Sequence, residues 1–440
     1  MSKVILLVEE KNDKDFLCAS DKAYELLGET SYETLLDDYK THYYHTFKDY
    51  LYNDNYEIQT PDEYIHDPEI PVFYLVKVAI TQDHFNPLWL NGISKKSLKL
   101  LKEHNIPIIL SQPKEYFLSF VDSENLWKVN SLTDFLDKKL GEIGLFRNNL
   151  IIHGIAKYIG KLDHFTVGQR KIFLHYSYYF FEKAKMMLEE ENNFCVSEDH
   201  VIEEKNKIAL CLNRQPRELR CLLISNLVNY IETSIFTMLA EEPLHNKLTP
   251  EQLYEIFEDN IKLVNNENLR KSLLDRLQIF KEKYPDFYRI KEIEAQTKNH
   301  ADANDKINDA RKEVLFELVT ETHSFKYRDS KIAIITEKTL WPILNHLPFT
   351  VIGHRFNIYF LKQLGFNMFE EWLLYEYQVS ENLEDTILHC ENLFEKYITD
   401  ENMSLMFENC IDACKENYLL LKNTDWNKKE KEELIGLFGR

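Results

Sequence analysis

The sequence predicts an α/β protein built from two Rossmann-like domains, with a helical insertion and a helical C-terminal tail. Two observations carry this prediction. Short apolar strands alternate with helices in two separate stretches of the chain, and a polar, acidic segment at 189–204 joins the stretches. The chain has 440 residues, more than one hydrophobic core normally serves, so two domains are expected. Scarce glycine (11) and proline (12) argue against a turn-dense all-β fold.

The first half of the chain alternates strand and helix from Pro71 onward, after a stretch of poor periodicity in the first sixty residues. Strands are expected at 72–80, 106–112 and 148–155, helices at 94–103 and 131–139, and a further apolar stretch at 171–180. Such alternation with short connections predicts a parallel sheet covered on both faces. We therefore assign residues 1–200 to an N-terminal α/β domain.

The second half repeats the alternation around a long helical insertion. Strands are expected at 207–213, 316–321, 331–335 and 349–353, with helices at 217–232, 251–263 and 267–283 and another from Thr336. The chain from about residue 360 onward is expected to be helical throughout. This predicts a C-terminal α/β domain at 205–400, followed by helices at 401–440 that pack back on the domains.

Composition restricts the classes of function. The formal charge of −20 disfavours broad nucleic-acid affinity, because nonspecific binding depends on cations that neutralise phosphates. No window approaches about 18 uncharged apolar residues, so neither a membrane span nor a signal peptide is expected. The seven cysteines lack a C-x-x-C pair, which favours reduced thiols and a cytoplasmic location. Cys410 and Cys414 have helical i,i+4 spacing and are interpreted as core residues, so no metal site is expected.

Ligands of open α/β sheets bind at the carboxyl ends of the strands, so the candidate site residues are the polar residues that follow each strand. The first half offers Asp83, His84, Lys114, Glu115 and His153. The second half offers Arg214, Glu321, His323, Glu337 and Lys338. Either set can equally cap the following helices, so position alone does not assign a role.

Three arginines of the second half lie around the expected start of a helix. These residues are Arg214, Arg217 and Arg220. Backbone N–H groups and the helix dipole favour an anion at such a start, and guanidinium groups bind phosphate bidentately. A diphosphate would fit this position. The alternative is that Arg217 and Arg220 decorate an exposed turn.

The T-E-K sequence at 336–338 combines three useful groups. Thr336 can cap a helix, the Glu337 carboxylate can accept two hydrogen bonds from a ribose, and the Lys338 ammonium can face a phosphate. An acidic first turn is also an ordinary way to begin a helix. Pro342 falls past the first turn and predicts a kink.

Residues 315–353 carry these features in a fixed order: a strand ending in Glu, a loop, T-E-K opening a helix, and a strand ending in Gly. This order resembles the donor-binding half of GT-B glycosyltransferases, especially the fucosyltransferase-like pattern. It is also similar to glycosyltransferase-like proteins of tailed phages, which share I-T-E-K-T-x-x-P and L-G-F-x-x-F, here at 364–369. Their L-N-R-x-P-R-x-x-R segment corresponds to 212–220, so the resemblance covers residues 207–373.

The resemblance implies that Glu337 holds the donor ribose, that Lys338 and Arg214 neutralise the diphosphate together with the neighbouring Arg217, and that Glu321 approaches the donor. The donor would be a UDP- or GDP-sugar bound between the halves, with no required cofactor and no bound metal. This chain departs from a compact donor domain by its helical insertion at 230–312. The first half would then bind the acceptor.

Transfer by inversion needs a base for the acceptor hydroxyl, and we expect it from the acceptor half. Asp83 is the first candidate and Glu115 the second, while His153 and His84 could substitute. The acceptor could be a hydroxymethylated base of phage DNA, a glycan or a protein. A DNA acceptor would require a basic strip, for which one predicted helix offers Lys95, Lys96, Lys99 and Lys102.

Two other functions remain open from the sequence. The chain could be a non-catalytic interaction protein on a glycosyltransferase-like scaffold, with its aromatic-rich first half as the partner surface. It could also be a nucleotide-sugar epimerase or another Rossmann-type enzyme, although no G-x-G-x-x-G follows any expected strand.

Overall fold

The computed structural model describes most of the chain: residues 3–11, 16–19, 22, 56–77, 87–111, 136–159, 164–189, 205–213, 216–237, 248–283, 307, 309–321, 332–354, 356–373, 383–397 and 400–438. It is an α/β protein with two compact units. The first unit comprises Met1–Glu182, Ser330–Ile332 and Asp425–Arg440, and the second comprises Lys183–Asp329 and Ala333–Thr424.

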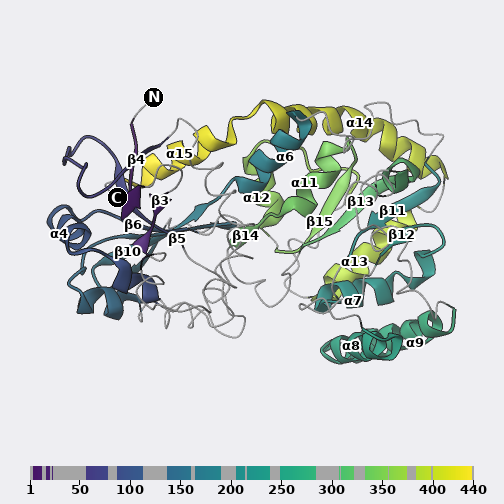
Figure 1. Ribbon diagram of the computed structural model, residues 1–440. Helices are drawn as coiled ribbons and strands as arrows, with labels where there is room; N and C mark the ends of the chain where they lie inside the picture. Colours follow the sequence, from purple (N-terminus) through teal and green to yellow (C-terminus); the bar gives the residue numbers. More distant parts are fainter. Residues whose placement is uncertain are drawn as a thin grey trace. The chain divides into compact units, whose positions relative to one another are not determined.

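The first unit contains a sheet, of which Figure 1 labels β4, β5, β6 and β10. The strand order among the described residues is β4-β1-β5-β6-β7-β10-β9. Its strands are β1 (Ile5–Leu7), β4 (Glu57–Gln59), β5 (Val72–Lys77), β6 (Ile108–Ser111), β7 (Leu150–Gly154), β9 (His164–Val167) and β10 (Arg170–Tyr176). Neighbouring strands pair in parallel, except that β9 pairs with β10 in antiparallel register at the edge. The first half of the chain therefore forms the mainly parallel sheet that its alternating pattern predicts.

Shorter elements complete the first unit. They are β2 (Glu10–Lys11), β3 (Phe16–Leu17), β8 (Ala156–Tyr158), η2 (Pro87–Gly92), α4 (Lys95–His104), a helix at 136–142 and α15 (Trp426–Leu437), while α6 (Tyr179–Glu189) begins in this unit. Ser94 caps α4 as predicted, since its side chain accepts a hydrogen bond from the Ser97 backbone at 3.1 Å. Asn105 ends α4 in the left-handed region, with φ of 50°.

The C-terminal helix α15 packs on one face of this sheet. Side chains alternate between faces along a strand, so Phe73 and Leu75 of β5 point to the same side. Both belong to a buried cluster that also contains Leu434 of α15. Tyr74 points to the other side, where its hydroxyl donates to the Glu9 carboxylate. The alternation therefore determines which residues of each strand face α15.

The second unit contains a parallel sheet with the order β12-β11-β13-β15 among its described residues. Its strands are β11 (Lys207–Cys211), β12 (Ile235–Phe236), β13 (Val314–Thr320) and β15 (Phe349–Ile352), and β14 (Ile332–Ile334) lies at the unit boundary. All residues of β13 and β15 are buried, as expected for strands covered on both faces.

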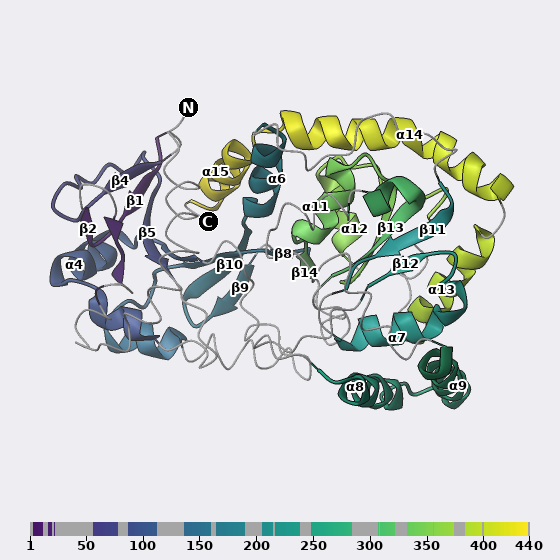
Figure 2. The same ribbon diagram turned by 45° about the vertical axis from the view of Figure 1, so that its right-hand side comes forward.

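Helices cover both faces of the second sheet (Figure 2). They are α7 (Glu218–Asn226), η5 (Val228–Tyr230), α8 (Pro250–Lys262), α9 (Glu267–Lys283), α11 (Glu337–Leu344), α12 (Asn357–Gln363), α13 (Leu383–Lys396) and α14 (Asp400–Asn423). Helix α7 contacts α8, α9 and α13, and α8 contacts α9. Helix α11 contacts α14, β13 and β15. Arg276 of α9 joins the first group, since its guanidinium donates to the Asn226 backbone and to Glu391, each at 2.7 Å.

Some elements differ from the sequence expectation at their ends. The apolar stretch 171–180 contains most of strand β10 and the start of helix α6. The strand ends at Tyr176, and Ser177 and Tyr178 connect it to the helix. The helix expected at 217–232 ends at Asn226, and η5 and β12 follow it. Within the described residues, no helix combines the length and the apolar character that crossing a bilayer requires.

Candidate functional site

The start of helix α11 lies at the carboxyl end of the second unit's sheet. Thr336 is the N-cap, and its hydroxyl accepts a hydrogen bond from the Lys338 backbone at 3.4 Å. The T-E-K sequence therefore opens a helix as predicted, with Glu337 and Lys338 in its first turn. Their side chains are 45% and 31% exposed, and the Lys338 ammonium lies 3.1 Å from the Glu337 carboxylate.

Glu321 anchors this helix start. The residue follows β13 and is only 2% exposed. Its carboxylate accepts hydrogen bonds from the Thr336 backbone at 3.1 Å, from the Thr336 hydroxyl at 2.8 Å and from the Thr339 hydroxyl at 2.5 Å. These contacts use both oxygens, so Glu321 positions the first turn of α11.

Gly353 leaves the room that Glu321 needs. A Cβ at this position would lie 2.9 Å from the Glu321 Cβ and 3.0 Å from the Asn357 Nδ2. We expect Gly353→Ala to lower the free energy of unfolding by about 1–3 kcal/mol, because overpacking displaces the carboxylate that holds α11. Urea denaturation followed by circular dichroism measures this. The control is Gly436→Ala, where the added Cβ meets nothing within 4 Å; equal losses in both variants would contradict the account.

The start of helix α7 lies at the same edge of the sheet. Arg217 is half-buried at its N-cap, and Arg220 is 3% exposed. The Arg220 guanidinium donates to the Thr320 carbonyl at 3.3 Å, which ties α7 to the end of β13. Burial and the neighbouring Arg217 lower the pKa of Arg220 to about 10, while Glu321 opposes this shift. Arg217, Arg220 and Glu321 thus share one electrostatic environment.

Hydrogen bonds join the strand ends beneath these helices. The Thr320 hydroxyl donates to the Asn213 side-chain oxygen at 2.6 Å, and the Asn213 backbone donates to the Thr237 hydroxyl at 3.0 Å. All three residues are buried. Thr320 ends β13, Asn213 follows β11, and Thr237 follows β12. The carboxyl edge of the second sheet is therefore fixed by side chains as well as by its backbone.

Several sequence-predicted residues lie outside the part of the chain that the structure describes. They are Asp83, His84, Lys114, Glu115, Arg214 and His323. Both proposed bases are in this set. Of the predicted donor residues, the structure places Arg217, Glu321, Glu337 and Lys338 at the carboxyl edge of one sheet.

A second polar group lies in the first unit, at the carboxyl end of its sheet. Ser111, His153 and His175 are register partners on the neighbouring strands β6, β7 and β10. Register partners point to the same face, and the alternation places this row on the face that α15 covers. Glu430 of α15 lies against the row, with its carboxylate 3.2 Å from the His153 Nε2. We name these four residues the histidine cluster.

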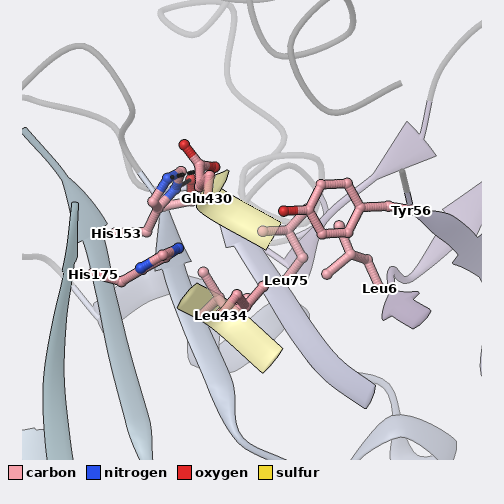
Figure 3. Close-up of a pocket in the computed structure, with 9 residues that line it drawn as sticks. Leu6, Tyr56, Leu75, His153, His175, Glu430 and Leu434 are labelled. Carbon is pink, nitrogen blue, oxygen red and sulfur yellow. Dashed lines mark hydrogen bonds and ion pairs between the residues drawn. The ribbon is translucent and has the colours of Figure 1, made fainter. Parts of the chain in front are cut away.

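Hydrogen bonds orient the histidine cluster (Figure 3). The Ser111 hydroxyl lies 2.6 Å from the His153 Nδ1, so the other ring nitrogen faces Glu430. The second Glu430 oxygen accepts a hydrogen bond from the Tyr178 backbone at 2.9 Å. The rings of His153 and His175 stack with their centroids 5.4 Å apart. All four side chains are buried, with residue exposures of 1–4%.

Burial controls the protonation of the cluster. It lowers the pKa of His153 well below its ordinary value and the pKa of His175 to about 3. Burial also raises the pKa of the Glu430 carboxyl well above its ordinary value. Each of these shifts favours the neutral form of its group. A cavity of about 10 Å³ adjoins the cluster, and Tyr56, Leu75 and Leu434 help to line it.

Sequence patterns identified only part of this cluster. His153 was predicted as a strand-end residue, whereas His175 and Glu430 were missed. One signal was present in the sequence: Trp426, Glu430 and Leu434 follow one another at i,i+4 spacing, so a carboxylate occupies the buried stripe of the last helix. His175 stands one residue before the end of its strand, as His153 does.

Comparisons with known proteins give no match for this chain among protein-family models, curated proteins or solved structures.

Proposed function

We propose that this protein is a GT-B-like glycosyltransferase, of the kind that phages encode, whose second unit binds a nucleotide diphosphate sugar. One observation carries the proposal: Glu337 and Lys338, both partly exposed, stand in the first turn of a helix at the carboxyl edge of a parallel sheet. Ligands of open α/β sheets bind at this edge. The buried Glu321 carboxylate holds this turn in place through its hydrogen bonds from the Thr336 backbone and hydroxyl.

The groups at this edge match the parts of a nucleotide sugar. A carboxylate such as Glu337 accepts hydrogen bonds from vicinal ribose hydroxyls. The Lys338 ammonium, the Arg217 guanidinium and the positive end of the α11 dipole favour the diphosphate. The same cations would stabilise the charge that the departing diphosphate gains during transfer, so the donor site would need no metal ion.

The organisation of the chain supports the GT-B part of the proposal. Each unit holds its own mainly parallel sheet, and the last helix, α15, packs on the sheet of the first unit. The first unit would then bind the acceptor, with Asp83 as the first candidate base and Glu115 as the second. The acceptor would be a hydroxymethylated DNA base, a glycan or a protein.

The test is thermal stabilisation of the full chain by nucleotides. A ligand at a hundred times its dissociation constant adds about 2.7 kcal/mol of stability. We expect UDP or GDP, and the corresponding sugar nucleotide, to raise the unfolding temperature, and adenosine nucleotides to do so less. If no nucleotide shifts the transition, the donor site is refuted and the non-catalytic interaction protein becomes the better description.

A further inference from the structure

We propose that His153, His175 and Glu430 bind one divalent transition-metal ion, with Zn²⁺ as the best fit, and that this ion fastens the C-terminal helix to the sheet of the first unit. Each residue offers one ligand atom, and the three atoms all lie within 4.8 Å of one another. The three ligands come from β7, β10 and α15, which are far apart in the sequence.

The donor set selects the class of metal. Two imidazoles and one carboxylate suit Zn²⁺ and its neighbours, whereas Mg²⁺ and Ca²⁺ prefer oxygen ligands throughout. Ligands about 2.1 Å from a tetrahedral ion stand roughly 3.4 Å apart. The His153 Nε2 and the Glu430 oxygen, 3.2 Å apart, already meet this spacing. His175 completes the set by a side-chain rotation that closes roughly 1.4 Å at most.

Outer hydrogen bonds prepare two of the ligands. Ser111 holds the Nδ1 of His153 at 2.6 Å, which turns the Nε2 toward Glu430. The Tyr178 backbone holds one oxygen of Glu430 at 2.9 Å and leaves the other beside His153. Partners of this kind fix ring and carboxylate orientation at metal sites.

His175 supplies a second, independent observation. It is 3% exposed, and its Nε2 has no hydrogen-bond partner within the described ranges of the chain. A buried polar atom without a partner costs free energy, so such atoms normally have a reason to persist. An ion between the three ligands would satisfy the Nε2.

Three protein ligands and one water give the open coordination that catalytic zinc sites share, but the burial of all three ligands favours a role in holding the helix. The ligands of this site are buried, and the adjoining cavity of about 10 Å³ has room for about one water molecule as a fourth ligand. It lies within the first unit, whereas the proposed donor residues belong to the second. Sugar transfer itself therefore needs no step at this ion, and the inference is independent of the proposed function. The inference differs from the expectation from the sequence that the chain has no metal site.

The first experiment uses the full chain, expressed with zinc, dialysed against metal-free buffer and analysed by plasma mass spectrometry. We expect one zinc per chain, a lower unfolding temperature after removal by a chelator, and recovery when Zn²⁺ is added back. Mg²⁺ should not restore the temperature. A wild-type chain that holds no zinc and whose unfolding temperature does not respond to Zn²⁺ would overturn the proposal.

Two variants locate the ion. Glu430→Gln keeps an acceptor for the Tyr178 backbone, and His175→Gln keeps a polar side chain, so both are designed to fold. We expect each to lose the zinc and the thermal response to Zn²⁺. The controls are Glu433→Gln, one turn along α15, and His164→Gln on β9 of the same sheet. Full zinc content in Glu430→Gln or His175→Gln would overturn the assignment, as would equal loss in the two controls.

Discussion

Glu337→Ala is expected to weaken the binding of UDP or GDP by roughly 10–100-fold, which corresponds to about 1.5–3 kcal/mol. The variant removes a charged acceptor for the ribose hydroxyls but leaves the helix cap, because Thr336 and Glu321 hold the α11 start without it. Isothermal titration calorimetry of the full chain measures the change. Circular dichroism should show that the fold is retained.

The matched control for this variant is Glu370→Ala. Glu370 is also a carboxylate of the second unit, its side chain is 51% exposed against 45% for Glu337, and it likewise pairs with a lysine, Lys362. Its partner Lys362 belongs to α12 and not to the α11 start, so the variant should leave nucleotide affinity unchanged. The assignment of Glu337 is wrong if both variants bind the nucleotide as the wild type does, or if both lose it equally.

Arg311→Met is expected to lower the free energy of unfolding by about 3–5 kcal/mol, because it leaves the Glu317 carboxylate buried without its charged partner. The guanidinium donates to Glu317 at 2.9 and 3.4 Å, and it lies 5.6 Å from the centre of the Trp341 ring. The side chains of Arg311 and Glu317 are 3% and 5% exposed. Urea denaturation measures the loss.

A double variant separates the pair from the packing. Arg311→Met combined with Glu317→Leu removes both charges and should recover most of the stability, since apolar replacements of a buried pair are often neutral. Lys312→Met, at the next residue, breaks only an exposed pair with Asp309 and should change little. If Arg311→Met is as stable as the Lys312 variant, the buried pair does not hold the start of β13.

Local signals in the sequence predicted the local structure well. Ser94 and Thr336 were expected to cap helices, and both do so, because the cap hydrogen bond joins residues two or three positions apart. The insertion helices expected at 251–263 and 267–283 are α8 and α9. The apolar runs predicted the positions of most strands. Several predicted strands extend beyond the observed ones, because the following turn or helix begins earlier than expected.

Long-range arrangement could not be predicted in the same way. The histidine cluster depends on the register of three strands and on a helix more than 250 residues beyond them, and no local pattern specifies either. Likewise, Glu321 follows a strand as a ligand-binding residue would, yet its partners are Thr336 and Thr339. A strand-end position shows which edge a side chain reaches, and tertiary contacts decide what it does there.

We propose that the second unit binds a nucleotide sugar at the start of α11. A crystal structure of the full chain grown with whichever of UDP or GDP stabilises it tests this most directly. We predict the diphosphate at the first turn of α11 beside Lys338 and Arg217, with the ribose hydroxyls within hydrogen-bond distance of the Glu337 carboxylate. A nucleotide bound anywhere else on the chain would contradict the claim.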